Sequence, residues 1–129
     1  MKMKTMWVFL AGLMFFVSAG VRAETQWQKD HPRRTQVNRR LKNQKNRVKT
    51  GEANGALTKA EGNKINRQDR RIRQEERRMA ARDGGHITKA DQAKLNRQEN
   101  RVSNEINRDE TANKAAQGAA APAPAASGQ

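Results

Sequence analysis

Few side chains in this sequence have the type and spacing that catalysis or metal binding requires. The two histidines, His31 and His86, fall in a predicted lead-in and a predicted loop, without the helical spacing of a metal-ligand pair. Ser103 and Ser127 lack the flanking glycines of a nucleophile elbow, and the chain contains no cysteine. The sequence therefore predicts a protein that is not an enzyme and that carries no metal or cofactor.

Two acidic segments offer weaker candidates for chemistry. Glu75 and Glu76 are adjacent carboxylates, but arginines precede and follow them, which is more typical of a solvated ion-pair network than of an acid/base pair. The segment 83–86, Asp-Gly-Gly-His, lacks the alternating oxygen ligands of a calcium loop. We therefore expect neither segment to carry a reaction or to hold an ion.

Positive charge is the dominant chemical feature of the chain. Its 129 residues include 27 Lys and Arg against 13 Asp and Glu, a formal net charge of +14. Such an excess attracts polyanions and anionic membranes through a long-range field and the release of counterions, although it can also serve solubility alone. The densest cluster lies in one predicted helix and supplies the candidate anion- or partner-binding residues: Arg67, Arg70, Arg71, Arg73, Arg77 and Arg78.

An internal repeat defines the elements that must position these arginines. The segment 57–61, Leu-Thr-Lys-Ala-Glu, returns thirty positions later at 87–91 as Ile-Thr-Lys-Ala-Asp. In each copy a threonine stands three residues before an acid, which is the spacing of a capping box at a helix start. The shorter aspartate reaches back less far than glutamate. The predicted caps are Thr58 with Glu61 and Thr88 with Asp91.

The repeat and the intervening glycines predict an all-α protein. We expect helices near 32–50, 58–82 and 88–113, separated by stops at 50–56 and 83–85. Short connections favour a small antiparallel three-helix bundle, with extended helical hairpins as the alternative. The predicted organisation is a signal peptide at 1–23, a polar lead-in at 24–31, a helical repeat domain at 32–114 and an Ala/Pro-rich disordered tail at 115–129.

Each predicted helix carries an apolar seam of coiled-coil width. Apolar, glutamine and apolar residues recur at i, i+3 and i+7 as the triplets Leu41-Gln44-Val48, Ile65-Gln68-Ile72 and Leu95-Gln98-Val102. The glutamines form either a polar layer for a partner or positions that set the register of the bundle, and we favour the second interpretation. The triplets place all three glutamines inside the shared seam.

The predicted core is thin. Twelve large apolar side chains follow the signal segment: Trp27, Val37, Leu41, Val48, Leu57, Ile65, Ile72, Met79, Ile87, Leu95, Val102 and Ile106. At roughly 1.5–3 kcal/mol for each fully buried side chain, they offset the ordering of about a hundred residues only marginally. We therefore expect some apolar side chains to stay accessible, with self-association or a partner as sources of further stability.

The first 23 residues predict export. Lys2 and Lys4 precede an apolar run, and small residues before Ala23 suit cleavage after that residue. A retained membrane anchor is the alternative, but the run is shorter than the ~20 residues that a spanning helix needs. We therefore expect the mature chain to be periplasmic or secreted.

The repeat also resembles a known family. Leu57-Thr-Lys-Ala-Glu61 and Ile87-Thr-Lys-Ala-Asp91, each opening a helix in a basic exported protein, are similar to the LTxxQ motifs of Spy/CpxP-type periplasmic proteins. The resemblance covers the two motifs and departs at their last position, where acids replace glutamine. It implies a stress-related chaperone or sensor adaptor with a cationic helical surface. The chain is also similar to uncharacterised small exported bacterial repeat proteins, which imply no function.

Two functional hypotheses follow from the sequence. The first is a chaperone-like module that binds unfolded or acidic protein segments, which we favour because the thin core leaves apolar side chains accessible. The second is an electrostatic binder of anionic envelope polymers (lipopolysaccharide, phospholipid or glycan) or of nucleic acid, with peripheral membrane contact as one form of it. Trp27 is the sole aromatic residue after the signal segment, so the chain lacks a base-stacking platform, which argues against nucleic acid.

Overall fold

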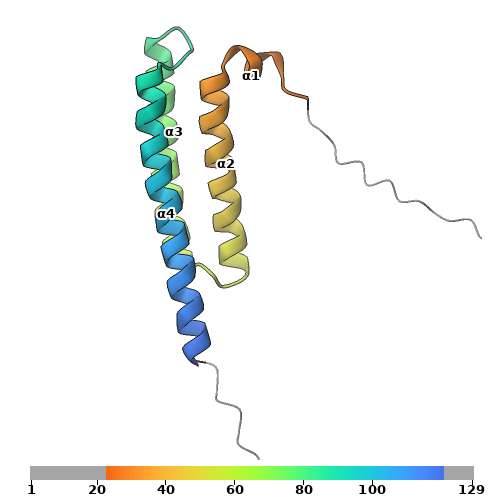
Figure 1. Ribbon diagram of the computed structural model, residues 1–129, viewed down its shortest axis with the longest axis vertical. Coiled ribbons are helices and arrows are strands. Elements are labelled where there is room, and N and C mark those ends of the chain that lie inside the picture. The colour runs from red at the N-terminus through yellow and green to blue at the C-terminus, as the bar shows by residue number, and fades with distance from the viewer. Residues whose placement is uncertain (1–22, 121–129) are drawn as a thin grey trace, which may run out of the picture.

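The computed structural model describes residues 23–120 as an all-α three-helix bundle with a short additional helix at its start. The helices are α1 (Gln26–Asp30), α2 (Pro32–Ala53), α3 (Lys59–Arg82) and α4 (Lys89–Ala120). The three long helices lie side by side, and their two connections are at opposite ends of the bundle (Figure 1). Thus α3 runs antiparallel to α2 and α4. The predicted fold class is confirmed, and its closed-bundle form is the one adopted, because each long helix packs against both others.

Threonine caps begin α3 and α4. The Thr58 hydroxyl accepts the Glu61 backbone N–H at 3.3 Å, and Glu61 Oε2 accepts the Thr58 N–H at 2.8 Å. At the start of α4, Thr88 accepts the Asp91 N–H at 3.0 Å, but the return contact from Thr88 N to Asp91 Oδ2 is 3.4 Å. The longer distance follows from the missing methylene of aspartate. At each helix start the threonine hydroxyl thus satisfies one of the backbone N–H groups that have no partner within the helix.

Glycines make the two turns between the long helices. Gly55, after α2, has φ +75°, and Gly84 and Gly85, after α3, have φ +60° and +96°. These left-handed conformations cost other L-residues steric energy, and they reverse the chain direction within a few residues. The turns therefore impose the antiparallel order on sequential helices.

The structure corrects both edges of the predicted helical domain. The polar lead-in at 24–31 contains a short helix that we did not predict, because Thr25 and Gln28 form a capping box that starts α1. At the other end α4 continues to Ala120, although we expected the helix to end between 111 and 116 and a tail to begin at 115. Residues 1–22, which hold the predicted signal peptide, and residues 121–129 lie outside the described part of the chain.

Two contacts explain why α4 is longer than predicted. Asn113 Nδ2 donates to the Ala56 carbonyl oxygen at 3.1 Å and to Glu61 Oε2 at 2.8 Å. One turn later, Gln117 Nε2 donates to the Gly55 carbonyl oxygen at 2.7 Å. Both bonds tie the end of α4 to the α2–α3 connection, and the alanines around them have the highest helix propensity. The composition that predicted a tail therefore supports a helix up to Ala120.

The apolar seam closes more completely than the sequence predicted. Eleven of the twelve predicted core side chains are at most 3% exposed, and Ala80 joins them. Trp27 is the exception: it is 44% exposed and stacks on His31, with ring centroids 4.6 Å apart. Among residues 23–120 it is the only large apolar side chain that is exposed. The expectation of accessible apolar seam residues is therefore wrong, because each narrow stripe is covered by two neighbouring helices.

Candidate anion-binding surface

Buried polar side chains interrupt the seam at different positions from those predicted. In α2, Gln44 is buried as expected, and its Nε2 donates to the Glu99 carbonyl oxygen at 2.7 Å. In α3 and α4, however, Gln68 and Gln98 lie half-buried at the seam edge. The core positions belong to the next residues, Asp69 and Glu99. The predicted placement of these two glutamines inside the seam was wrong. In α3 and α4 the three buried positions of each triplet are separated by four and then three residues, whereas we had predicted three and then four.

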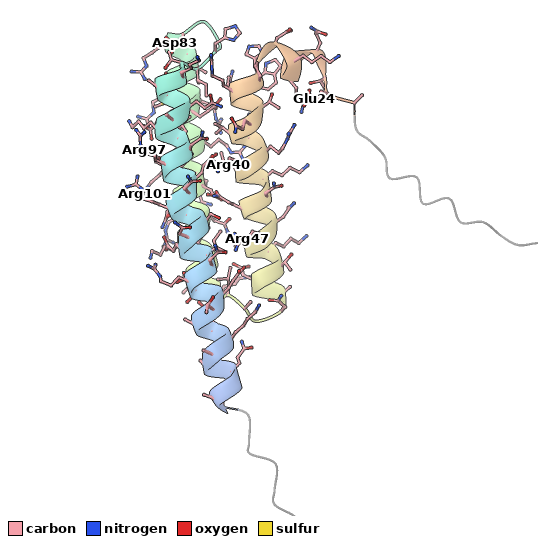
Figure 2. The ribbon with its side chains drawn as sticks, in the orientation of Figure 1. Glu24, Arg40, Arg47, Asp83, Arg97 and Arg101 are labelled. Atoms are coloured by element: carbon pink, nitrogen blue, oxygen red, sulfur yellow. The ribbon has the colours of Figure 1, made fainter. Side chains whose placement is uncertain are left out.

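The buried acids are paired mainly with arginines of α2. Arg34 Nε donates to Glu76, whose side chain is 2% exposed, and Arg40 Nη1 donates to Glu99 Oε2 at 3.1 Å. One heptad later, Arg47 Nη2 donates to Glu110 Oε2 at 3.0 Å. Figure 2 shows Arg40 and Arg47 extending between α2 and α4. We name Arg34, Arg40 and Arg47 the inner arginines, because their charge is used inside the bundle.

Two of the buried carboxyl groups have strongly raised pKa values. Burial raises the pKa of Asp69 to about 6, with the charge of Arg73 acting in the opposite direction. Burial also raises the pKa of Glu99 to about 7, against the opposing effect of Arg40 and with a contribution from the charge of Asp69. Neither Asp69 oxygen has a hydrogen-bond partner within the described part of the chain. These groups therefore affect the pH dependence of folding.

The predicted arginine cluster on α3 has a different environment. Arg67, Arg70, Arg71, Arg77 and Arg78 are exposed, and Arg73 is half-buried near Asp69. Between residues 23 and 120, none of the six makes an ion pair or a hydrogen bond, whereas every inner arginine does. Their guanidinium groups are therefore available to an external anion.

The α4 helix adds two arginines that the sequence prediction did not include. Arg97 and Arg101 are exposed, and they project from the side of α4 that faces away from α2 (Figure 2). The thirty-residue repeat relates them to Arg67 and Arg71, a relation that could have identified them. Arg82, at the end of α3, is also exposed and unpaired among the described residues, and we reserve the name arginine surface for the seven others: Arg67, Arg70, Arg71, Arg77, Arg78, Arg97 and Arg101.

Two clusters of a lysine, a glutamine and a glutamate join α3 to α4 beneath this surface, and we call them the reciprocal clusters. Lys64 and Gln68 of α3 bind Glu105 of α4 at 2.7 and 2.9 Å. Their repeat equivalents in α4, Lys94 and Gln98, bind Glu75 of α3 at 2.6 and 2.7 Å. Hydrogen bonds from the lysine and the glutamine lower the pKa of each carboxyl group. The two copies of the repeat thus hold each other in a symmetric antiparallel hairpin, and both acids stay ionised at neutral pH.

Comparisons with protein-family models, curated proteins and solved structures give no match to this chain. The similarity of the two capped segments to LTxxQ motifs therefore stays a prediction. Residues 23–120 contain no group of three or more His, Cys, Asp or Glu side chains arranged to hold a metal ion. None of the described helices is long and apolar enough to span a membrane.

Proposed function

We propose that this protein is a non-enzymatic, exported binder of anionic envelope polymers such as lipopolysaccharide, and that the arginine surface is its binding surface. This proposal rests on the difference in environment between two sets of arginines. The arginines of the arginine surface are exposed without partners among the described residues, while the inner arginines are held by carboxylates. A surface of this kind attracts polyanions through its field and through counterion release.

Burial of the apolar seam is the reason we now rank polymer binding above chaperone activity. A chaperone that holds unfolded segments needs apolar contact in addition to charge. Within residues 23–120, the only exposed large apolar side chain is Trp27, which lies on α1 at one end of the bundle. The arginine surface lies on α3 and α4 and contains no exposed large apolar side chain.

Arginine is well suited to this role. Its planar guanidinium donates two parallel hydrogen bonds to a phosphate or a carboxylate, and its charge persists at every physiological pH. A set of such exposed groups spread over two helices can contact a polymer at several points along its length. Affinity should then depend on the number of anionic groups neutralised, and therefore on salt.

A salt series distinguishes the two functional hypotheses. Binding of the exported chain to lipopolysaccharide is measured by titration between low and physiological ionic strength, beside suppression of aggregation of an unrelated unfolded protein. We expect the logarithm of the binding constant to fall linearly with the logarithm of salt concentration, and aggregation to proceed unaffected. Aggregation suppression that survives moderate salt, together with salt-insensitive or absent polymer binding, would contradict the proposal and favour the chaperone hypothesis.

A further inference from the structure

Arg71 and Arg101 share a hollow between α3 and α4. The hollow has a volume of about 290 Å³, and its lining also includes Ile72, Val102, Glu105 and the glutamine of each reciprocal cluster. Ile72 and Val102 are almost fully buried, so they form its floor, whereas both arginines are exposed. Because Arg71 and Arg101 are equivalent positions of the repeat, the hollow brings two like charges together at the centre of the symmetric hairpin.

The acids one turn along the same helices, Glu75 and Glu105, are bonded to the opposite helix, and Glu105 also lines the hollow. Arg71 and Glu75 are four residues apart on α3, as are Arg101 and Glu105 on α4, and that spacing commonly gives an ion pair within a helix. Here each glutamate instead accepts bonds from the lysine and glutamine of the opposite helix. The hairpin thus leaves both guanidinium groups without an ion pair among the described residues.

We propose that Arg71 and Arg101 form a binding site for one phosphate group, specifically a phosphomonoester. This inference rests on the proposed function and deepens it, since it names the anionic group that the polymer or lipid must present. A monoester carries about two negative charges near neutral pH, which match the two guanidinium charges. Its terminal oxygens can accept one bidentate fork on each side, whereas a single carboxylate has only two oxygens and satisfies one fork.

The repeat supplies a charge-matched control for this site. Arg67 and Arg97 are also equivalent positions, are also exposed, and do not line the hollow. The double substitution R71Q/R101Q is therefore compared with R67Q/R97Q. Both variants lose two positive charges from exposed sites on the same two helices, so both should keep the helical circular dichroism of the unsubstituted chain.

Three anionic probes test the site. Affinity is measured for vesicles containing phosphatidic acid, which presents a lipid phosphomonoester, and for lipopolysaccharide and poly-glutamate. We expect R71Q/R101Q to weaken phosphatidic-acid binding about tenfold more than R67Q/R97Q does, because it removes two charge-assisted contacts to one group. Both variants should weaken poly-glutamate binding equally. Equal losses on phosphatidic acid would overturn the site.

A small soluble probe shows whether the site binds a free phosphomonoester or a lipid headgroup. It also distinguishes failure of the site from failure of the proposed function. Phenyl phosphate is titrated while the Nε–H signals of the arginines are followed by nuclear magnetic resonance. Selective shifts of Arg71 and Arg101 support a site that takes soluble phosphomonoesters, while a selective loss confined to vesicles supports a lipid headgroup. If those shifts occur but the chain binds no polymer, the proposed function fails and the site stands. If polymers bind and the two double variants behave alike on every probe, the site fails and the proposed function stands.

Discussion

The inner arginines and the arginine surface show how one residue type serves two purposes in a small bundle. Arg34, Arg40 and Arg47 lie where α2 faces the other helices, and each meets a carboxylate of α3 or α4. The exposed arginines of the arginine surface meet none in the described chain. Net charge alone cannot distinguish the two sets, because the difference comes from what lies opposite each residue. The first set should control stability, and the second should control binding.

The largest effect that this comparison predicts comes from breaking an inner pair. Arg34→Gln leaves Glu76 in the core without its cation, and an uncompensated buried charge costs about 3 kcal/mol or more. Urea unfolding followed by circular dichroism measures the loss. The double variant Arg34→Gln/Glu76→Gln should recover much of it, because the buried charge is then gone. A single variant as stable as the unsubstituted chain would show that the pair does not contribute to folding.

Replacing Asp69, the buried acid without a partner, should change stability less and in the opposite direction, because it should stabilise the fold at neutral pH. In the folded protein the pKa of Asp69 is about 6, above its ordinary value of 3.8. Between these values the folded state binds more protons than the unfolded state, so this group lowers stability as pH rises. Asp69→Asn should therefore stabilise the bundle by about 1–2 kcal/mol at pH 8 and by little at pH 4.

Urea unfolding of Asp69→Asn and the unsubstituted chain at both pH values tests this sign. The difference between the two proteins removes the contribution of the surface acids whose pKa values are lowered, and it reports Asp69 together with the effect of its charge on the pKa of Glu99. An identical effect of the substitution at pH 4 and pH 8 would show that folding does not change the proton affinity of Asp69.

The smallest effect on stability is expected on the arginine surface. Arg77→Gln removes an exposed side chain without an ion pair in the described residues, so the unfolding free energy should change by no more than about 0.5 kcal/mol. The same urea titration provides the measurement. A loss comparable to that of Arg34→Gln would erase the distinction between the two sets of arginines.

Local signals allowed most of the fold to be predicted from the sequence. The Thr58 and Thr88 segments mark helix starts, glycines mark the turns, and the apolar spacing identifies the seam. These features work because each depends on residues close in the chain. The short α1 also had such a signal in Thr25 and Gln28, but five residues are too few for an apolar period to support it.

Other features depend on residues that are distant in sequence. The extension of α4 relies on Asn113 and Gln117 bonding to the α2–α3 connection, and composition alone suggested a tail there. Likewise, the core position of Glu99 becomes visible only when Arg40 of α2 lies opposite it. The cluster of arginines on α3 was evident from the sequence. Its separation from the inner arginines was not, because that separation requires knowing which helix faces which.

A charge-matched comparison of two faces tests whether the arginine surface determines polymer binding. One variant replaces Arg70, Arg77 and Arg78 of the arginine surface with glutamine, and the other replaces the exposed Lys42, Lys45 and Lys49 of α2. Binding of each to lipopolysaccharide is measured across a salt series. We predict that the α3 variant loses most of its affinity and has a shallower salt dependence, while the α2 variant stays close to the unsubstituted protein. Equal losses in both variants would show instead that net charge, and not the arginine surface, determines binding.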